Sequence, residues 1–260
     1  MRSLRLSLLA VGLLGLTLGG CLKRRQEVDP LDALLAAVDR AWERRGTDGL
    51  EPVGVALEAA WEMRRDAPGV RWREARYHVA LGLVEQDDAQ ALRHFARARS
   101  HSLFCLDGVS GFGTLRRAGR WTEALSRVEA ERAPCASWGG VAWVRWRLSM
   151  REAGALDDPA IQGFLAGMPA DDLRLDLWAR ATAASIYDLQ SAEIAYRDAI
   201  EAAPEDFVRR ADRLILVTSR ERPAQAQVRA QTVLQMTPRT PEERAAYERL
   251  DRILGGPVRL

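Results

Sequence analysis

The stretch DLQSAEIAYRDAIEAAP, residues 188–204, determines the fold that we expect for the whole chain. Its packing residues recur with the 3.6-residue period of one helix face: Ala192, Tyr196, Ala199 and Ile200. Asp188 or Ser191 can cap the start of this helix, and Pro204 ends it. The order of a small, a large and a small side chain allows a second helix to approach closely at the alanines. The stretch therefore predicts one half of a helix pair.

Prolines recur along the chain at a nearly constant spacing. Almost equal intervals separate Pro134, Pro169, Pro204 and Pro238, and Pro68 precedes Pro134 by close to two such intervals. A fixed period of about 34 residues is typical of stacked helix–turn–helix units, each of which buries its apolar face against its neighbours. The spacing predicts an all-α solenoid in which prolines close the repeats.

We expect about six repeats over residues 31–254, followed by a short tail over residues 255–260. The repeats have approximate boundaries at residues 31–68, 71–101, 103–134, 137–169, 171–204 and 205–238. Residues 242–254 form a final helix with a polar outer face, which suits a helix that caps the exposed end of an array. Gly108, Gly111 and Gly113 lie inside the first helix of the third repeat, and they indicate either a local break or close backbone packing.

The spacing, the Ala-x-x-x-(Phe/Tyr)-x-x-Ala order and the prolines resemble tetratricopeptide (TPR) repeats. Ala91, Phe95 and Ala98 repeat the order that is found at residues 192–199. The resemblance implies a TPR-like α-solenoid of antiparallel helix pairs with a concave binding face. An irregular α-solenoid is the alternative architecture.

The N-terminus has the features of a lipoprotein leader. Residues 1–20 combine Arg2 and Arg5 with the apolar run Leu6–Leu18, which is too short to span a membrane comfortably as a helix. The following Leu18-Gly19-Gly20-Cys21 resembles the lipobox of bacterial lipoproteins. This resemblance implies cleavage before Cys21, its lipidation and stable anchoring by several acyl chains. Residues 21–30 form a polar tether, and Leu22 favours the outer membrane, with the folded part facing the periplasm.

The charge balance argues against nucleic acid as a partner. The chain carries 38 basic and 36 acidic residues, and removal of Arg2 and Arg5 with the leader leaves equal numbers. A nucleic-acid-binding domain needs a strongly basic face, which a neutral chain does not suggest.

Two cysteines remain once Cys21 is acylated, and an oxidising compartment favours their pairing. We predict a disulfide between Cys105 and Cys135, which lie near the first helices of consecutive repeats. The alternative is a pair of free, buried thiols.

The sequence contains no motif of an enzyme active site that we can identify. The run Gly108-Val109-Ser110-Gly111 lacks the final glycine and the preceding strand of a nucleophile elbow, and it lacks the Gly-Lys-Ser/Thr of a phosphate loop. We therefore predict no catalytic residue and no cofactor. A metal site would require His78, His94 and His101 to converge in one pocket, and we predict no metal because their spacing is not that of a zinc motif.

The expected concave face carries aromatic and basic side chains. By alignment with TPR repeats, the candidate groove residues are Tyr77, Arg116, Arg147, Arg151 and Trp178. An aromatic floor with arginine edges suits an extended or helical segment that carries acidic residues or a C-terminal carboxylate.

These features together predict a non-enzymatic scaffold or adaptor. We expect a lipid-anchored protein of the outer membrane that binds a segment of another envelope protein. Its layout is similar to that of the pilotin lipoproteins of type IV pilus secretins and of the repeat-containing lipoprotein of the β-barrel assembly machinery. The alternatives are a passive structural lipoprotein and a lipid-anchored metal-binding protein or enzyme.

Overall fold

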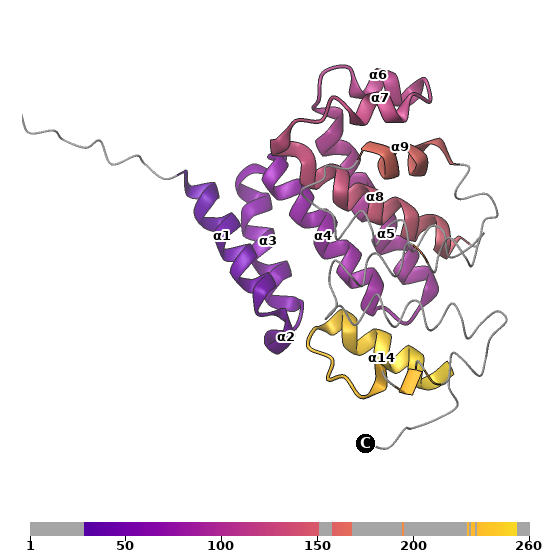
Figure 1. The fold of residues 1–260 in the computed structure, drawn as a ribbon. Coiled ribbons are helices and arrows are strands. Elements are labelled where there is room, and N and C mark those ends of the chain that lie inside the picture. Colours follow the sequence, from indigo (N-terminus) through magenta and orange to yellow (C-terminus); the bar gives the residue numbers. More distant parts are fainter. Residues whose placement is uncertain are drawn as a thin grey trace, which may run out of the picture.

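The computed structural model describes residues 29–150, 158–167 and 233–253, together with residues 194, 228, 230 and 231. These parts of the chain form ten α-helices and a single turn of 3₁₀ helix, without a β-strand (Figure 1). The elements are α1 (Pro30–Glu43), α2 (Arg45–Asp48), α3 (Glu51–Arg64), α4 (Pro68–Val84), α5 (Asp88–Asp107), α6 (Phe112–Arg117), α7 (Trp121–Leu125), η1 (Ala130–Arg132), α8 (Ala133–Ser149), α9 (Pro159–Gly167) and α14 (Pro241–Ile253). The predicted all-α class is confirmed.

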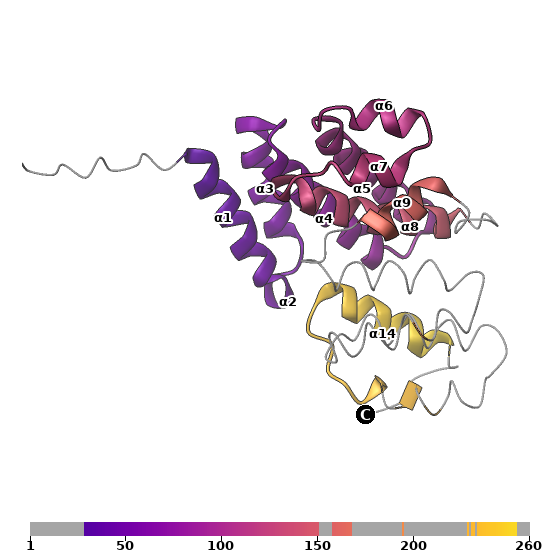
Figure 2. The same ribbon diagram turned by 45° about the horizontal axis from the view of Figure 1, so that its top comes forward.

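Consecutive long helices pack against each other as hairpins. Helix α1 packs against α3, α4 against α5, and α8 against α9, and α5 also packs against α8 (Figures 1 and 2). The helix pairs expected in the first, second and fourth repeats, at residues 31–68, 71–101 and 137–169, are therefore present. In the described ranges no helix has the length and hydropathy needed to cross a bilayer.

Prolines open helices here, which corrects the interpretation of Pro68 and Pro134 as the ends of repeats. Pro68 is the first residue of α4, and Pro134 is the second residue of α8. Similar positions are taken by further prolines at the starts of other helices: Pro30, Pro52, Pro159 and Pro241. Proline suits the first turn because its ring fixes φ and because the first amide groups of a helix have no intrahelical acceptor. These prolines therefore mark where helices begin.

The α4–α5 hairpin is held by the predicted order of small and large side chains. Ala91, Phe95 and Ala98 are buried on the face of α5 that meets α4. Gly82 of α4 receives the ring of Phe95, because a Cβ atom built on Gly82 would lie 2.6 Å from Phe95 Cε1. Asp87 caps α5 by accepting a hydrogen bond from the Gln90 amide at 2.8 Å.

The third predicted repeat is broken rather than closely packed at its glycines. Helix α5 continues to residue 107, Gly108 follows its last turn, and Gly111 has a φ of +76° immediately before α6. A positive φ is accessible to glycine at little cost, so Gly111 can hold the non-helical conformation that separates α5 from α6. Helices α6 and α7 contain only 6 and 5 residues, so this region covers the end of the α5–α8 pair with two short helices.

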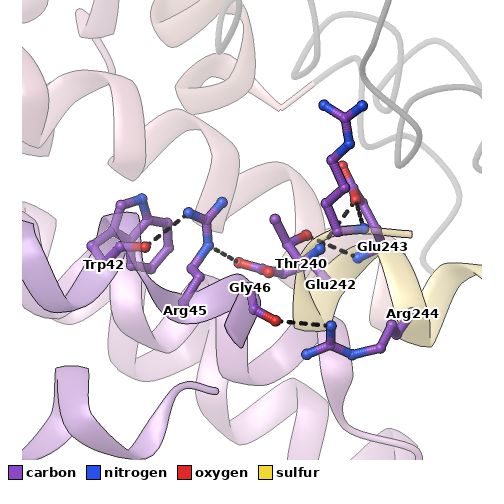
Figure 3. Close-up of polar contacts among 8 residues, drawn as sticks. Trp42, Arg45, Gly46, Thr240, Glu242, Glu243 and Arg244 are labelled. Atoms are coloured by element: carbon purple, nitrogen blue, oxygen red, sulfur yellow. Dashed lines mark hydrogen bonds and ion pairs between the residues drawn. The ribbon is translucent and has the colours of Figure 1, made fainter. Parts of the chain in front are cut away.

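The C-terminal helix returns to the N-terminal part of the described fold. Helix α14 packs against α4, and its polar residues contact α2 and the end of α4 (Figures 1 and 3). Glu242 accepts a hydrogen bond from Arg45 at 3.1 Å, Arg244 donates to the carbonyl of Gly46 at 3.1 Å, and Arg249 donates to that of Leu83 at 2.8 Å. The predicted final helix is present, but its polar face, which we expected to point outward, supplies contacts to helices from the first third of the chain, and Glu242 is buried there.

Several predictions concern residues outside the described ranges. They are the leader and tether, the fifth repeat with its helix at residues 188–204, most of the sixth repeat and the tail. Within the sixth repeat, Ala230 and Val233 are buried against Ala246 and Leu250 of α14.

Candidate functional site

All three histidines of the chain meet between α4 and α5. The imidazole of His78, on α4, stacks on those of His94 and His101, which lie two turns apart on α5. The ring centroids are 5.5 Å and 5.6 Å apart, and Nδ1 of His78 lies 3.2 Å from Nδ1 of His94. The convergence that a metal site requires, and that the sequence did not indicate, is present in the structure.

Glu74 adds a carboxylate to this cluster. It precedes His78 by one helical turn on α4, and its Oε2 atom lies 3.9 Å from Nε2 of His78. Both side chains are 13% exposed. One ligand atom from each of Glu74, His78 and His101 can be chosen such that all of them lie within 4.8 Å of one another. The α4–α5 interface therefore holds the donor set of a two-histidine, one-carboxylate site.

Burial keeps these histidines neutral at neutral pH. Desolvation, with a contribution from the other histidines and Arg97, lowers the pKa of His78 to about 3. Desolvation, together with the charges of Arg71 and Arg97, lowers the pKa of His101 to about 4. Burial also raises the pKa of the Glu74 carboxyl, and the charge of Arg71 opposes that rise. A neutral imidazole keeps one nitrogen lone pair, which is the form that binds metals.

Arg71 borders the cluster and determines which ring nitrogen of His101 carries the proton. Its guanidinium lies between the rings of Trp61 and Phe104, 4.4 Å and 3.9 Å from their centroids. The same group contacts Asp66 at 3.3 Å and Nδ1 of His101 at 3.2 Å. Because a guanidinium can only donate hydrogen bonds, Nδ1 of His101 must accept, and the proton of that ring resides on Nε2.

A second polar centre joins the first hairpin to α4. Asp39 of α1 accepts hydrogen bonds from Arg73 at 2.9 Å and from Arg76 at 3.1 Å. Arg76 also lies over the rings of Trp42 and Trp72, 4.2 Å and 4.9 Å from their centroids. These contacts are internal to the described fold and join α1 to α4.

The described groove candidates each contact a different part of the fold. Tyr77 packs against the α1–α3 core, and its hydroxyl end lies next to the backbone of Gly54. Arg116 of α6 pairs with Asp107 at 3.3 Å, across the glycine break. Arg147 of α8 lies 3.4 Å from Asp158, which caps α9 by accepting a hydrogen bond from the amide of Ala160. Arg151, Trp178 and the lipidation site Cys21 lie outside the described residues.

The predicted cysteine pair is close enough to bond, and it does so. Cys105, near the end of α5, and Cys135, near the start of α8, form a disulfide with a Cα–Cα distance of 6.2 Å. Both residues are buried in the core beneath α6 and α7. The covalent link therefore joins the two helices at the end where α5 gives way to the broken third repeat.

Sequence reasoning missed Glu74 and Arg71 as neighbours of the histidines. The spacing Glu74-x-x-x-His78 was an available signal, because residues four apart share a helix face. Arg71 lies about one helical turn before Glu74, on the same face of the helix. The approach of His101, however, depends on how α5 is rotated against α4, which one sequence does not reveal.

No protein-family model matches the chain, and no curated protein matches its sequence.

Proposed function

We propose that the chain is a lipid-anchored scaffold that binds a segment of another envelope protein on a surface of TPR-like helical repeats. The proposal combines three elements: the lipobox at residues 18–21, the series of helix hairpins and the disulfide. The anchor holds the protein at the outer membrane and raises its effective concentration near a partner in the same membrane. The hairpins supply the surface for a short segment.

The observation that carries the proposal is the Cys105–Cys135 disulfide. Stable disulfides are typical of oxidising compartments such as the periplasm and are rare in the bacterial cytosol. The pair involves both cysteines that would remain after lipidation of Cys21. The formation of this disulfide therefore supports export of the folded part of the chain, which the lipobox also suggests.

The helix packing supports the TPR-like architecture. The α4–α5 hairpin uses the Ala-x-x-x-Phe-x-x-Ala order, with Gly82 opposite Phe95, and α8–α9 follows beside it. Arg116 and Arg147 belong to the first helices of the third and fourth predicted repeats, which line the concave face in TPR proteins. We assign to this face the recognition of an acidic segment or a C-terminal carboxylate.

Crosslinking in native membranes, followed by identification of the captured proteins, tests the proposal. We expect recovery of an outer-membrane assembly, such as a pilus secretin or the β-barrel assembly machinery. Recovery should fall in a double variant, Arg116→Gln with Trp178→Ala. Arg117→Gln is the matched control, because Arg117 is the exposed neighbour of Arg116 in α6.

A Cys21→Ala version separates the two parts of the proposal. If this change alone removes the captured protein, the anchor rather than the groove forms the complex. If wild-type protein captures nothing above background, the scaffold proposal is wrong and a passive structural role is favoured. Retention of the complex in the double variant would contradict the assigned face.

A further inference from the structure

We propose that Glu74, His78 and His101 bind one divalent transition-metal ion of the zinc class between α4 and α5. Two of the ligands lie one turn apart on α4, and the third comes from the facing helix. This inference does not depend on the scaffold function, since none of the three ligands is among the residues to which partner recognition is assigned.

The distances require only small movements. Zinc binds imidazole nitrogens and carboxylate oxygens at about 2.0–2.2 Å, so neighbouring ligand atoms in a tetrahedral site are about 3.4 Å apart. Oε2 of Glu74 and Nε2 of His78 are 3.9 Å apart, and the full set lies within 4.8 Å. We expect rotations about side-chain bonds to close these gaps. Three protein ligands leave a fourth position for water or another ligand.

His94 occupies the position of a supporting residue. Metal-binding histidines usually donate a hydrogen bond from the ring nitrogen that does not coordinate. Nδ1 of His78 lies 3.2 Å from Nδ1 of His94, and it can donate when His94 carries its own proton on Nε2. The lone pair of His78 then resides on Nε2, the atom that faces Glu74.

Arg71 opposes metal binding, and this gives the proposal its sharpest test. If His101 coordinates through Nδ1, the metal takes the lone pair that now accepts from Arg71 at 3.2 Å. If it coordinates through Nε2, the ring proton moves to Nδ1 and faces the guanidinium. In both cases Arg71 must withdraw toward Asp66, whose carboxylate already accepts from it at 3.3 Å. Removal of this charge should therefore strengthen binding.

Isothermal titration of the full chain with Zn²⁺, after treatment with a chelator, measures the site. The protein must carry no polyhistidine tag. We expect one Zn²⁺ per chain and at least tenfold weaker binding in each of Glu74→Gln, His78→Gln and His101→Gln. His94→Leu should weaken binding by about 10–100-fold, as expected for a supporting residue. Arg71→Met, which keeps a long side chain between Trp61 and Phe104, should bind more tightly than the wild type.

Two controls make these results specific. Glu62→Gln changes an exposed carboxylate of α3 and should leave the affinity unaltered. Titration with Co²⁺ should give the intense visible absorption of a four-coordinate site, and Glu74→Gln should abolish it. Circular dichroism of each metal-free variant confirms that its helices are retained.

The proposal is overturned if the wild type binds no Zn²⁺, or if Glu74→Gln binds as tightly as the wild type. It is equally overturned if Arg71→Met leaves the affinity unchanged, because His101 would then not be a ligand. Should a histidine variant fail to fold, Glu74→Gln and Arg71→Met still decide the matter, since their expected effects have opposite signs.

Discussion

Gly82 shows how one residue sets the distance between two helices. Replacement of glycine by alanine in a helix interior normally gains about 1 kcal/mol. At Gly82, however, the new Cβ would lie 2.6 Å from the ring of Phe95, which is buried in the helix interface. We expect Gly82→Ala to destabilise the protein by about 1–3 kcal/mol, as overpacked cores do. Urea unfolding measures the change.

Gly113→Ala is the matched control for this prediction. Gly113 lies in α6, and the nearest atoms to an added Cβ belong to the flexible ends of Asp107 and Arg117. These ends can move aside, so the helical gain should dominate and the free energy of unfolding should rise slightly. An equal effect of the two substitutions would contradict the role assigned to Gly82.

Asp39 should make the stability of the fold depend on pH in the acid range. Burial alone would raise its pKa, but hydrogen bonds and charge from Arg73 and Arg76 lower the pKa below the usual range. A carboxyl group with a lowered folded-state pKa stabilises the fold above the unfolded value of about 3.9. That contribution is lost as the pH falls through the folded-state pKa.

Asp39→Asn tests this expectation. At pH 7 we expect a loss of about 1–2 kcal/mol, discounted because the carboxylate is partly exposed. The difference from the wild type should shrink as the pH falls below about 4. Chemical denaturation at a series of pH values measures it. Asp48→Asn removes an exposed ion pair with Arg44 and should change stability little at any pH. A difference for Asp39→Asn that is constant with pH would disprove the charge-based account.

At the scale of helices, the disulfide ties α5 to α8 where the third repeat is weakest. A bond between residues 30 apart contributes about 3–4 kcal/mol in the chain-entropy model. We expect reduction to lower the thermal midpoint of the wild type. The double variant Cys105→Ala with Cys135→Ala should already have a lower midpoint, and a reductant should not change it further. Calorimetry with and without dithiothreitol measures both, and a reductant effect on the double variant would point to another cause.

The helices also show what a single sequence can reveal. Apolar periodicity predicted the α1–α3, α4–α5 and α8–α9 pairs because local spacing fixes the buried face of each helix. The roles of Pro68 and Pro134 were assigned wrongly because proline is compatible both with a helix start and with the residues after a helix end. The histidine cluster was not foreseen, since it depends on the rotation of α5 against α4. One residue of error in register turns a helical side chain by about 100°.

At the scale of the whole molecule, α14 connects the two ends of the described fold. Thr240 and Glu243 form a reciprocal capping box at its start, with hydrogen bonds of 3.1 Å and 3.2 Å between side chains and amides (Figure 3). The helix begins immediately beside Arg45 and Gly46 of α2, and farther along its length it reaches the end of α4. An open array would keep its final helix apart from the helices of its first repeat, whereas here α14 contacts α2 directly.

This contact predicts that the stability of α2 and of the end of α4 depends on α14. Glu242 is 8% exposed at its side chain and Arg45 is 22% exposed, so their ion pair is only weakly screened by solvent. Arg45 also donates to the carbonyl of Trp42 at 3.0 Å, so it keeps one partner when Glu242 is changed. We expect Glu242→Gln to cost about 1–3 kcal/mol.

Hydrogen exchange locates the effect. In Glu242→Gln, amide protection should fall in residues 45–49 and 83–86 as well as in α14, while the middle of α5 should keep its protection because the polar contacts of α14 are made to α2 and to the end of α4. Glu248→Gln is the control, since Glu248 makes a solvent-exposed contact with Gln86 and its loss should cost little. Loss of protection confined to α14 would mean that the C-terminal helix rests on the fold without stabilising it.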